Sequence, residues 1–426
     1  MKRAVLIIGT VDTKGTELVY LRNKIEAEGV KTFLMDVSCR IAQSNYPADV
    51  SCLRVSEEIG EEFGQIAQMD KASAIELMTR EAMKMAKRMI VGEIFCGIIG
   101  LGGANGAEIA CGVMRTLPVG FPKLMVTCVA SGNVRPYVGA KDIMMANSIG
   151  DISLNKITKR IFSNAARAIA SMAKAWPVKD EGENKPQICI STFGVTLPCV
   201  ERAKCLLEEK GFEVIELHSS GTGGMALEDL VRTGEISGVL DITTSELVDE
   251  MVGGIFSAGP NRLEAAGCIG IPQVISVGAL DFANFGARET LPEKYRNRNF
   301  YFYTPSITLM RTNVQESRTL GKTIAEKANR SNGPTAIIIP QKGFSALDRQ
   351  GGPQMTTIDG STSGEWYDET CIAALIDAIK EHLDSSKVKL VGVDAHINDP
   401  EFAKIAVELL SEMLENRDAQ KERNKK

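Results

Sequence analysis

The sequence predicts an α/β protein with doubly wound parallel sheets. Three observations support this fold class. Short apolar runs rich in β-branched residues alternate with amphipathic stretches along most of the 426 residues. Glycine-rich loops follow several of these runs. The same order of elements restarts after a polar segment, so we expect two domains that face each other across a central cleft.

The first domain is expected over residues 1–178. It opens with the apolar run 4–8, continues through GTVDTKGTE at 9–17, and enters an amphipathic stretch that ends at Gly29. This order indicates a strand, a loop and a helix. The run 95–101 is apolar on all sides, which is typical of a parallel strand covered on both faces. Further strands are expected at 31–36 and 123–129, and further helices at 70–87 and 154–173.

The segment 175–187 marks the domain boundary. It holds two prolines, five charged residues and one glycine, and it has no periodicity. The second domain is expected over 186–415, with strands at 188–192, 213–217, 238–242, 272–277, 335–339 and 388–393. The charged run 416–426 is expected to be a flexible, solvated tail.

Composition excludes some classes of partner. The net charge of −5, from 49 basic and 54 acidic residues, gives no electrostatic reason to expect nucleic acid or an anionic membrane. Ten cysteines without a Cys-x-x-Cys motif suggest reduced thiols and a cytoplasmic protein. No uninterrupted apolar window is long enough to span a membrane.

Glycine-rich loops at expected strand ends are the candidate ligand site, because ligands of open α/β sheets bind beyond the carboxyl ends of the strands. A helix that starts there offers unpaired N–H groups to a phosphate or carboxylate. Lys14 could neutralise a phosphate, and Asp12 could either hold Mg²⁺ or cap the helix. No Walker loop is present, and the loop 100–108 misses the dinucleotide fingerprint by one residue. The candidate binding residues are Gly9, Thr10, Asp12, Thr13, Lys14, Gly102, Gly103, Ala104, Asn105, Gly106, Ser131, Gly132, Gly221, Thr222, Gly223 and Gly224.

Four residues of the second domain are candidate catalytic groups. His218 ends a strand beside the loop 219–224, where an imidazole could act as a general acid or base; a hydrogen bond to a loop carbonyl is the alternative. Asp241 and Glu246 follow a strand, where they could be catalytic or could cap a helix. Arg311 could clamp a carboxylate or phosphate, or pair with a structural acid.

Several long blocks are distinctive: GTVDTKGTE at 9–17, GLGGANGAE at 100–108, HSSGTGGMALEDL at 218–230 and DAHINDPEFA at 394–403. They resemble the Tm-type (tomato mosaic virus resistance protein-like) ATP-binding domain family. The resemblance implies two Rossmann-like domains, ATP binding and a homodimer. The chain departs from the family pattern at Ala104 and Ala107, where hydroxyl residues are usual, and in the polar loop 351–369, whose role the sequence leaves open.

Two functions follow as expectations. The first is a cytosolic protein that binds ATP, with Asp12 as the candidate ligand of a Mg²⁺ ion. The second is an enzyme that acts on a small organic acid in the interdomain cleft, as a lyase, a hydrolase or an acyl or phosphoryl transferase, through His218, Asp241, Glu246 and Arg311. The expected partners are a nucleotide or acid ligand and a second copy of the chain.

Overall fold

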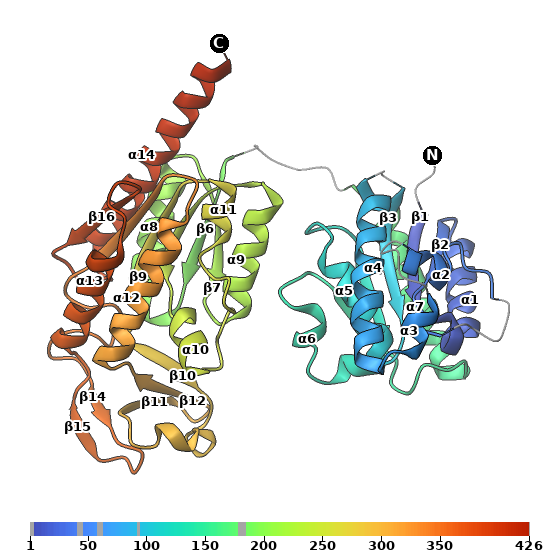
Figure 1. Cartoon of the computed structure of the whole chain (residues 1–426), viewed down its shortest axis with the longest axis horizontal. Coiled ribbons are helices and arrows are strands. Elements are labelled where there is room, and N and C mark those ends of the chain that lie inside the picture. Colours follow the sequence, from blue (N-terminus) through green and yellow to red (C-terminus); the bar gives the residue numbers. More distant parts are fainter. Residues whose placement is uncertain (1–3, 41–45, 58–62, 92–93, 178–184, 426) are drawn as a thin grey trace. The chain divides into compact units, whose positions relative to one another are not determined.

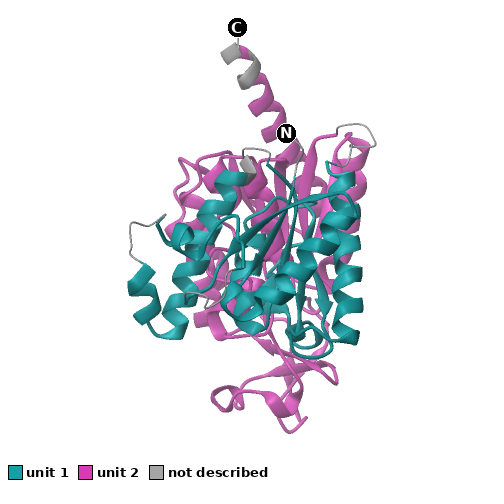
Figure 2. Ribbon diagram, turned by 90° about the vertical axis from the view of Figure 1, so that its right-hand side faces the viewer, with its two compact units in different colours: residues 1–182 teal, residues 183–426 magenta. Residues whose placement is uncertain are grey.

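The computed structural model describes residues 4–40, 46–57, 63–91, 94–177 and 185–425. The chain forms two compact units, residues 1–182 and 183–426, which are coloured separately in Figure 2. Each unit is described by itself.

Unit 1 holds a five-stranded parallel sheet, as the α/β prediction requires. Its strands are β1 (Ala4–Gly9), β2 (Lys31–Asp36), β3 (Phe95–Leu101), β4 (Lys123–Thr127) and β5 (Met144–Asn147), in the order β2-β1-β3-β4-β5. The chain leaves β1 in one direction to β2 and later returns to its other side at β3. The carboxyl ends of β1 and β3 therefore form the switch point at which such sheets bind ligands.

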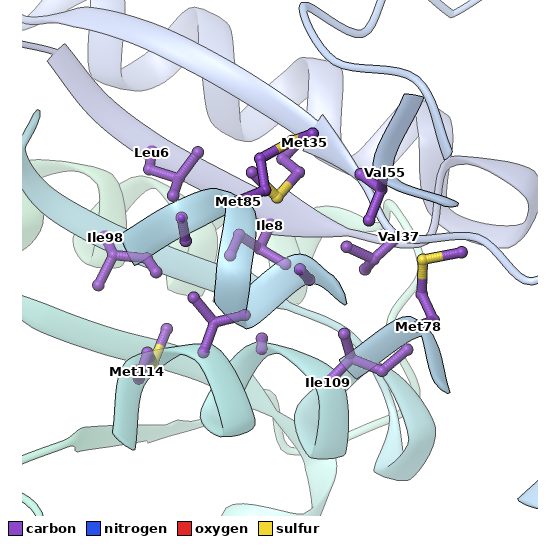
Figure 3. Packing of buried hydrophobic residues seen from close by; sticks show 14 of the residues in the cluster. Leu6, Ile8, Met35, Val37, Val55, Met78, Met85, Ile98, Ile109 and Met114 are labelled. Carbon is purple, nitrogen blue, oxygen red and sulfur yellow. The ribbon is translucent and has the colours of Figure 1, made fainter. Parts of the chain in front are cut away.

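Helices cover both faces of this sheet. Alternate residues of β1 point to opposite faces, as strand geometry requires. Val5 and Ile7 pack with α1 (Val11–Ala27) and α7 (Lys156–Ala175), whereas Leu6 and Ile8 pack with α4 (Lys71–Val91) and α5 (Ala104–Arg115). Figure 3 shows the second of these cores, with Met85 of α4 and Ile109 and Met114 of α5 gathered on β1 and β3. The short helices are α2 (Cys52–Ser56), α3 (Phe63–Gln68) and α6 (Arg135–Val138).

Unit 2 holds a six-stranded parallel sheet in the order β16-β13-β9-β8-β6-β7. Helices α8 (Leu197–Glu209) and α14 (Pro400–Lys425) cover one face. Helices α9 (Thr222–Thr233), α10 (Glu246–Val252), α11 (Ala265–Ile269), α12 (Val314–Asn329) and α13 (Glu369–His382) pack on the other (Figure 1). The strands are β6 (Gln187–Thr192), β7 (Glu213–His218), β8 (Ile236–Thr243), β9 (Gln273–Gly278), β13 (Thr335–Pro340) and β16 (Val388–Val393).

A second sheet in unit 2 was not expected from the sequence. Its strands are antiparallel and follow the order β10-β12-β11-β14-β15. The polar loop 351–369 contributes β14 and β15 to it. The strands are β10 (Phe282–Phe285), β11 (Phe300–Thr304), β12 (Ile307–Arg311), β14 (Gln354–Thr356) and β15 (Thr362–Glu365).

The C-terminal residues differ from the expected flexible tail. Helix α14 continues to Lys425, so residues 416–425 are helical. This stretch includes two arginines, two lysines, one alanine, one glutamine and one glutamate, which have high helix propensity. Arg417 also anchors it, because its Nη1 donates to the carbonyl of Ser237 at 2.7 Å. Within the described ranges, no helix combines the length and the apolar character that a membrane span requires.

Candidate functional site

A cavity of about 330 Å³ lies at the carboxyl edge of the unit 1 sheet. The start of α1 and the first turns of α5 both line it, so two of the predicted glycine loops meet at one cavity. Helices α3 and α4 and the residues after β2 complete its wall. The lining residues are Thr10, Asp12, Thr13, Cys39, Arg40, Ile66, Ala67, Met69, Lys71, Ala74, Ile75, Asn105 and Ile109.

The N-terminus of α1 is already occupied by side chains of the same unit. The amide of Val11 donates to Oδ1 of Asp36 at 3.1 Å, and the amide of Asp12 donates to Oγ of Ser38 at 3.0 Å. The next two amides both donate to the carbonyl oxygen of Thr10. Asp36 is 5% exposed. A buried carboxylate thus takes the place at which the sequence suggested a ligand phosphate.

The N-terminus of α5 is different. Its cap residue is Gly103, which makes no side-chain cap, and no side chain of another described residue caps the helix. Gly102 packs so tightly that an added Cβ would lie 2.9 Å from the Cα of Gly106. The helix begins at Ala104, and Asn105 lines the cavity. The first-turn amides, which have no partner within the helix, therefore lie next to the cavity and are not capped from within the described residues.

Asp12 is the acidic residue among the described residues that line the cavity. Its Oδ1 is buried and has no hydrogen-bond partner among the described residues. Burial raises the pKa of Asp12 above its ordinary value, a hydrogen bond with Ser38 lowers it, and the nearby charge of Asp36 raises it. A hard divalent cation such as Mg²⁺ would satisfy this oxygen, because Mg²⁺ is commonly held by one or two carboxylates with the substrate phosphates. Asp12 thus offers one carboxylate ligand to such an ion, and the described residues contain no group of three or more His, Cys, Asp or Glu side chains that could hold a metal by themselves.

Lys14 and the 131–132 turn do not line this cavity. Lys14 Nζ donates to the carbonyl of Ile152 at 2.6 Å and lies 3.8 Å from the carboxylate of Asp151. Ser131 and Gly132 are exposed, and both are held by hydrogen bonds within the turn after β4. Gly9 ends β1 and packs against Leu18.

In unit 2, the loop before α9 binds a carboxylate of its own unit. The amides of Gly221 and Gly224 both donate to Oε1 of Glu246, at 2.8 and 3.0 Å. Oε2 of Glu246 accepts from Nε of Arg262 at 2.6 Å, and the two Nη atoms of Arg262 donate to Asp241 at 2.5 and 2.7 Å. Both carboxylates and the guanidinium are buried. Asp241 and Glu246 thus belong to one internal ion-pair network.

Close packing explains two glycines of this loop. An added Cβ at Gly224 would lie 2.0 Å from Oε2 of Glu246, and one at Gly223 would lie 1.9 Å from the carbonyl oxygen of His218. Thr222 is the first residue of α9. These glycines are needed for α9 to pack close to β7 and the buried ion pairs. This packing explains their presence without a ligand.

The four predicted catalytic residues lie in three different settings. His218 is exposed at the end of β7, its ring centroid is 5.0 Å from that of Phe193, and partial burial lowers its pKa. Asp241 and Glu246 pair with Arg262, as described above. Arg311 is 5% exposed and donates to the carbonyls of Trp366 and Asp281 and to the carboxylate of Asp348. No hydrogen bond or ion pair within the described residues joins these settings.

Sequence reasoning missed the residues that organise both loops. Asp36 ends an expected strand, so its position at a strand end was a usable signal. Arg262 carried no local signal, because its partners are 16 and 21 positions away. Arg40 and Lys71 line the cavity but lie in no recognisable motif.

Sequence comparisons find relatives along nearly the whole chain. Residues 3–177 match the N-terminal domain and residues 185–414 the C-terminal domain of the Uncharacterised protein family (UPF0261). A UPF0261 protein of Clostridium tetani is 43% identical over 97% of this chain and 100% of its own length, and UPF0261 protein RA0729 of Rhizobium meliloti is 39% identical over 96% and 98%. The ToMV resistance protein Tm-1(GCR237) of Solanum lycopersicum is 33% identical over 96% of this chain and 55% of its own length. The resemblance to Tm-type proteins is thereby confirmed, although the comparisons indicate no ATP-binding domain.

Proposed function

The chain belongs to the UPF0261 family, and from the cavity of unit 1 we propose that it binds a nucleotide, ATP together with Mg²⁺. One observation carries the proposal. At the β1/β3 switch point, the N-terminus of α5, which no described side chain caps, and Asp12, whose buried Oδ1 has no hydrogen-bond partner among the described residues, border the same cavity. The first suits phosphate oxygens and the second suits a divalent cation.

The remaining lining residues divide by chemistry in a way that suits a nucleotide. Arg40 and Lys71 are exposed cations that can approach phosphate oxygens, and the hydroxyls of Thr10 and Thr13 add donors and acceptors. The apolar wall, which includes Ile66, Ile75 and Ile109, suits the face of a base. The cavity volume also lies within the range of small-molecule sites, roughly 300–1,000 Å³.

In this proposal, the phosphates lie at α5 rather than α1. Asp36 already accepts from the first amide of α1, and a second anion there would meet a like charge. Lys14 is outside the ligand set because its ammonium is bonded to Ile152. Bound Mg²⁺ would screen the phosphate charge from Asp12. The protein residues would bind and orient the nucleotide.

Isothermal titration calorimetry of the full chain with ATP tests the proposal. Wild-type protein should bind ATP in the presence of Mg²⁺ and more weakly with EDTA. Asp12→Asn should remove most of this Mg²⁺ dependence. Lys71→Ala should weaken binding about tenfold, which corresponds to about 1.4 kcal/mol.

Lys87→Ala is the matched control, since Lys87 is an exposed lysine on the same helix that does not line the cavity. It should bind like the wild type. The proposal fails if the wild type does not bind ATP with Mg²⁺, or if Asp12→Asn and Lys71→Ala both bind as it does.

A further inference from the structure

Three buried side chains join the two sheets of unit 2. Arg311 ends β12 of the antiparallel sheet, Asp281 follows β9 of the parallel sheet, and Asp348 lies in the loop after β13. Asp348 accepts from Nη2 of Arg311 at 3.2 Å and from the amide of Phe344 at 3.1 Å. Asp281 accepts, through Oδ2, from Nε1 of Trp366 at 2.8 Å. We call this set the sheet junction.

The charges of the sheet junction do not balance if both carboxyl groups are ionised. Asp281 is 1% exposed and Asp348 is fully buried, while Arg311 supplies one positive charge. Oδ1 of Asp281 is buried and lacks a hydrogen-bond partner within the described part of the chain. Two buried carboxylates beside one guanidinium are costly, and a single proton removes the excess charge.

We propose that Asp348 holds a proton beside the buried carboxyl group of Asp281, so that the sheet junction is a pH-sensitive contact between the two sheets of unit 2. When one proton is bound, the two carboxyl groups and the Arg311 guanidinium together carry no net charge. Loss of that proton leaves an uncompensated negative charge between the sheets and loosens their contact.

The surroundings of Asp348 agree with this account. The pKa of Asp348 is raised to about 7 because burial and the charge of Asp281 raise it more than the charge of Arg311 lowers it. The ordinary value is about 4, so between pH 4 and pH 7 the folded chain holds a proton that the unfolded chain has released. Stability of unit 2 therefore falls as pH rises through this window. The titratable or charged groups near the pair are Arg311, Tyr367, Asp368, Cys371 and His396.

Trp366 is an intrinsic fluorescent probe of the sheet junction. It is fully buried and donates directly to Asp281. The chain has two tryptophans, so Trp176→Phe leaves Trp366 as the single one. In that background, Trp366 fluorescence of the full chain should show a transition with a midpoint near pH 7 between pH 5.5 and pH 8.5.

Variants identify the groups that titrate. Asp348→Asn keeps an oxygen for Arg311 and should abolish the transition. Asp281→Asn should move the midpoint to lower pH, because it removes the like charge. Asp249→Asn and His396→Gln are controls that should keep the transition. The proposal is overturned by a flat wild-type profile, by a transition that persists in Asp348→Asn, by an unmoved midpoint in Asp281→Asn, or by loss of the transition in either control.

Discussion

Replacement of Glu246 by alanine tests whether the loop before α9 depends on an internal carboxylate. The change removes the partner of Nε of Arg262 and leaves the amides of Gly221 and Gly224 without their acceptor. Breaking a buried ion pair costs about 3–5 kcal/mol, and an unsatisfied buried donor costs about 1–3 kcal/mol. Because the same atoms contribute to both terms, we expect a loss of about 4 kcal/mol.

Thermal unfolding followed by Trp366 fluorescence in the Trp176→Phe background measures this loss. For a unit of this size, 1 kcal/mol corresponds to a shift of about 2–4 °C, so Glu246→Ala should lower the midpoint by about 8–16 °C. Millimolar acetate should restore part of the shift, since its carboxylate can reoccupy the vacated amides. Glu250→Ala on the same helix is the control, because Glu250 is exposed and should change stability by no more than about 0.5 kcal/mol. A loss below about 1 kcal/mol in Glu246→Ala would refute the reasoning and would reopen the loop as a ligand site.

Three further outcomes are expected. Gly224→Ala should destabilise unit 2 by about 2–4 kcal/mol in denaturant unfolding, because its Cβ would lie 2.0 Å from Glu246; a neutral result would contradict the packing. Lys14→Ala should leave the calorimetric affinity for ATP within about twofold of the wild type, since its ammonium bonds to Ile152; a tenfold loss would return Lys14 to the binding site. Burial raises the pKa of Asp249 to about 7, so the folded chain binds the extra proton and stability falls from pH 4 to pH 7; Asp249→Asn should make this dependence shallower in urea unfolding at pH 5, 6, 7 and 8, and an unchanged slope would argue against it.

The parallel sheets could be predicted from the sequence because their signal is local. Runs such as Phe95–Leu101 and Val388–Val393 are short and apolar and adjoin loops or helices, and the structure has strands with these same bounds. The antiparallel sheet was missed although β11 (FYFYT) and β12 (ITLMR) are rich in aromatic and β-branched residues; its other hairpin lacks a local signal. Strands β14 and β15 have only three and four residues, largely polar; they pair with each other, and β14 also pairs with β11.

The candidate site could be predicted only in part. Glycine loops indicated the edge of the unit 1 sheet at which the cavity lies, since strand ends and helix starts are visible locally. The group that accepts the hydrogen bonds of each loop's amides depends on tertiary contacts. Asp36 reaches Val11 across 25 positions, and Glu246 reaches Gly221 across the same separation. A sequence pattern cannot distinguish a loop that binds a ligand from one that binds its own carboxylate.

Amide hydrogen exchange of the full chain, with and without ATP and Mg²⁺, tests the central claim most directly. The account predicts slower exchange at the start of α5, residues 104–106, when the nucleotide is present. It also predicts unchanged exchange at Gly221 and Gly224, because Glu246 already holds their amides. Protection at Gly221 and Gly224 with none at residues 104–106, or no protection at either loop, would contradict it.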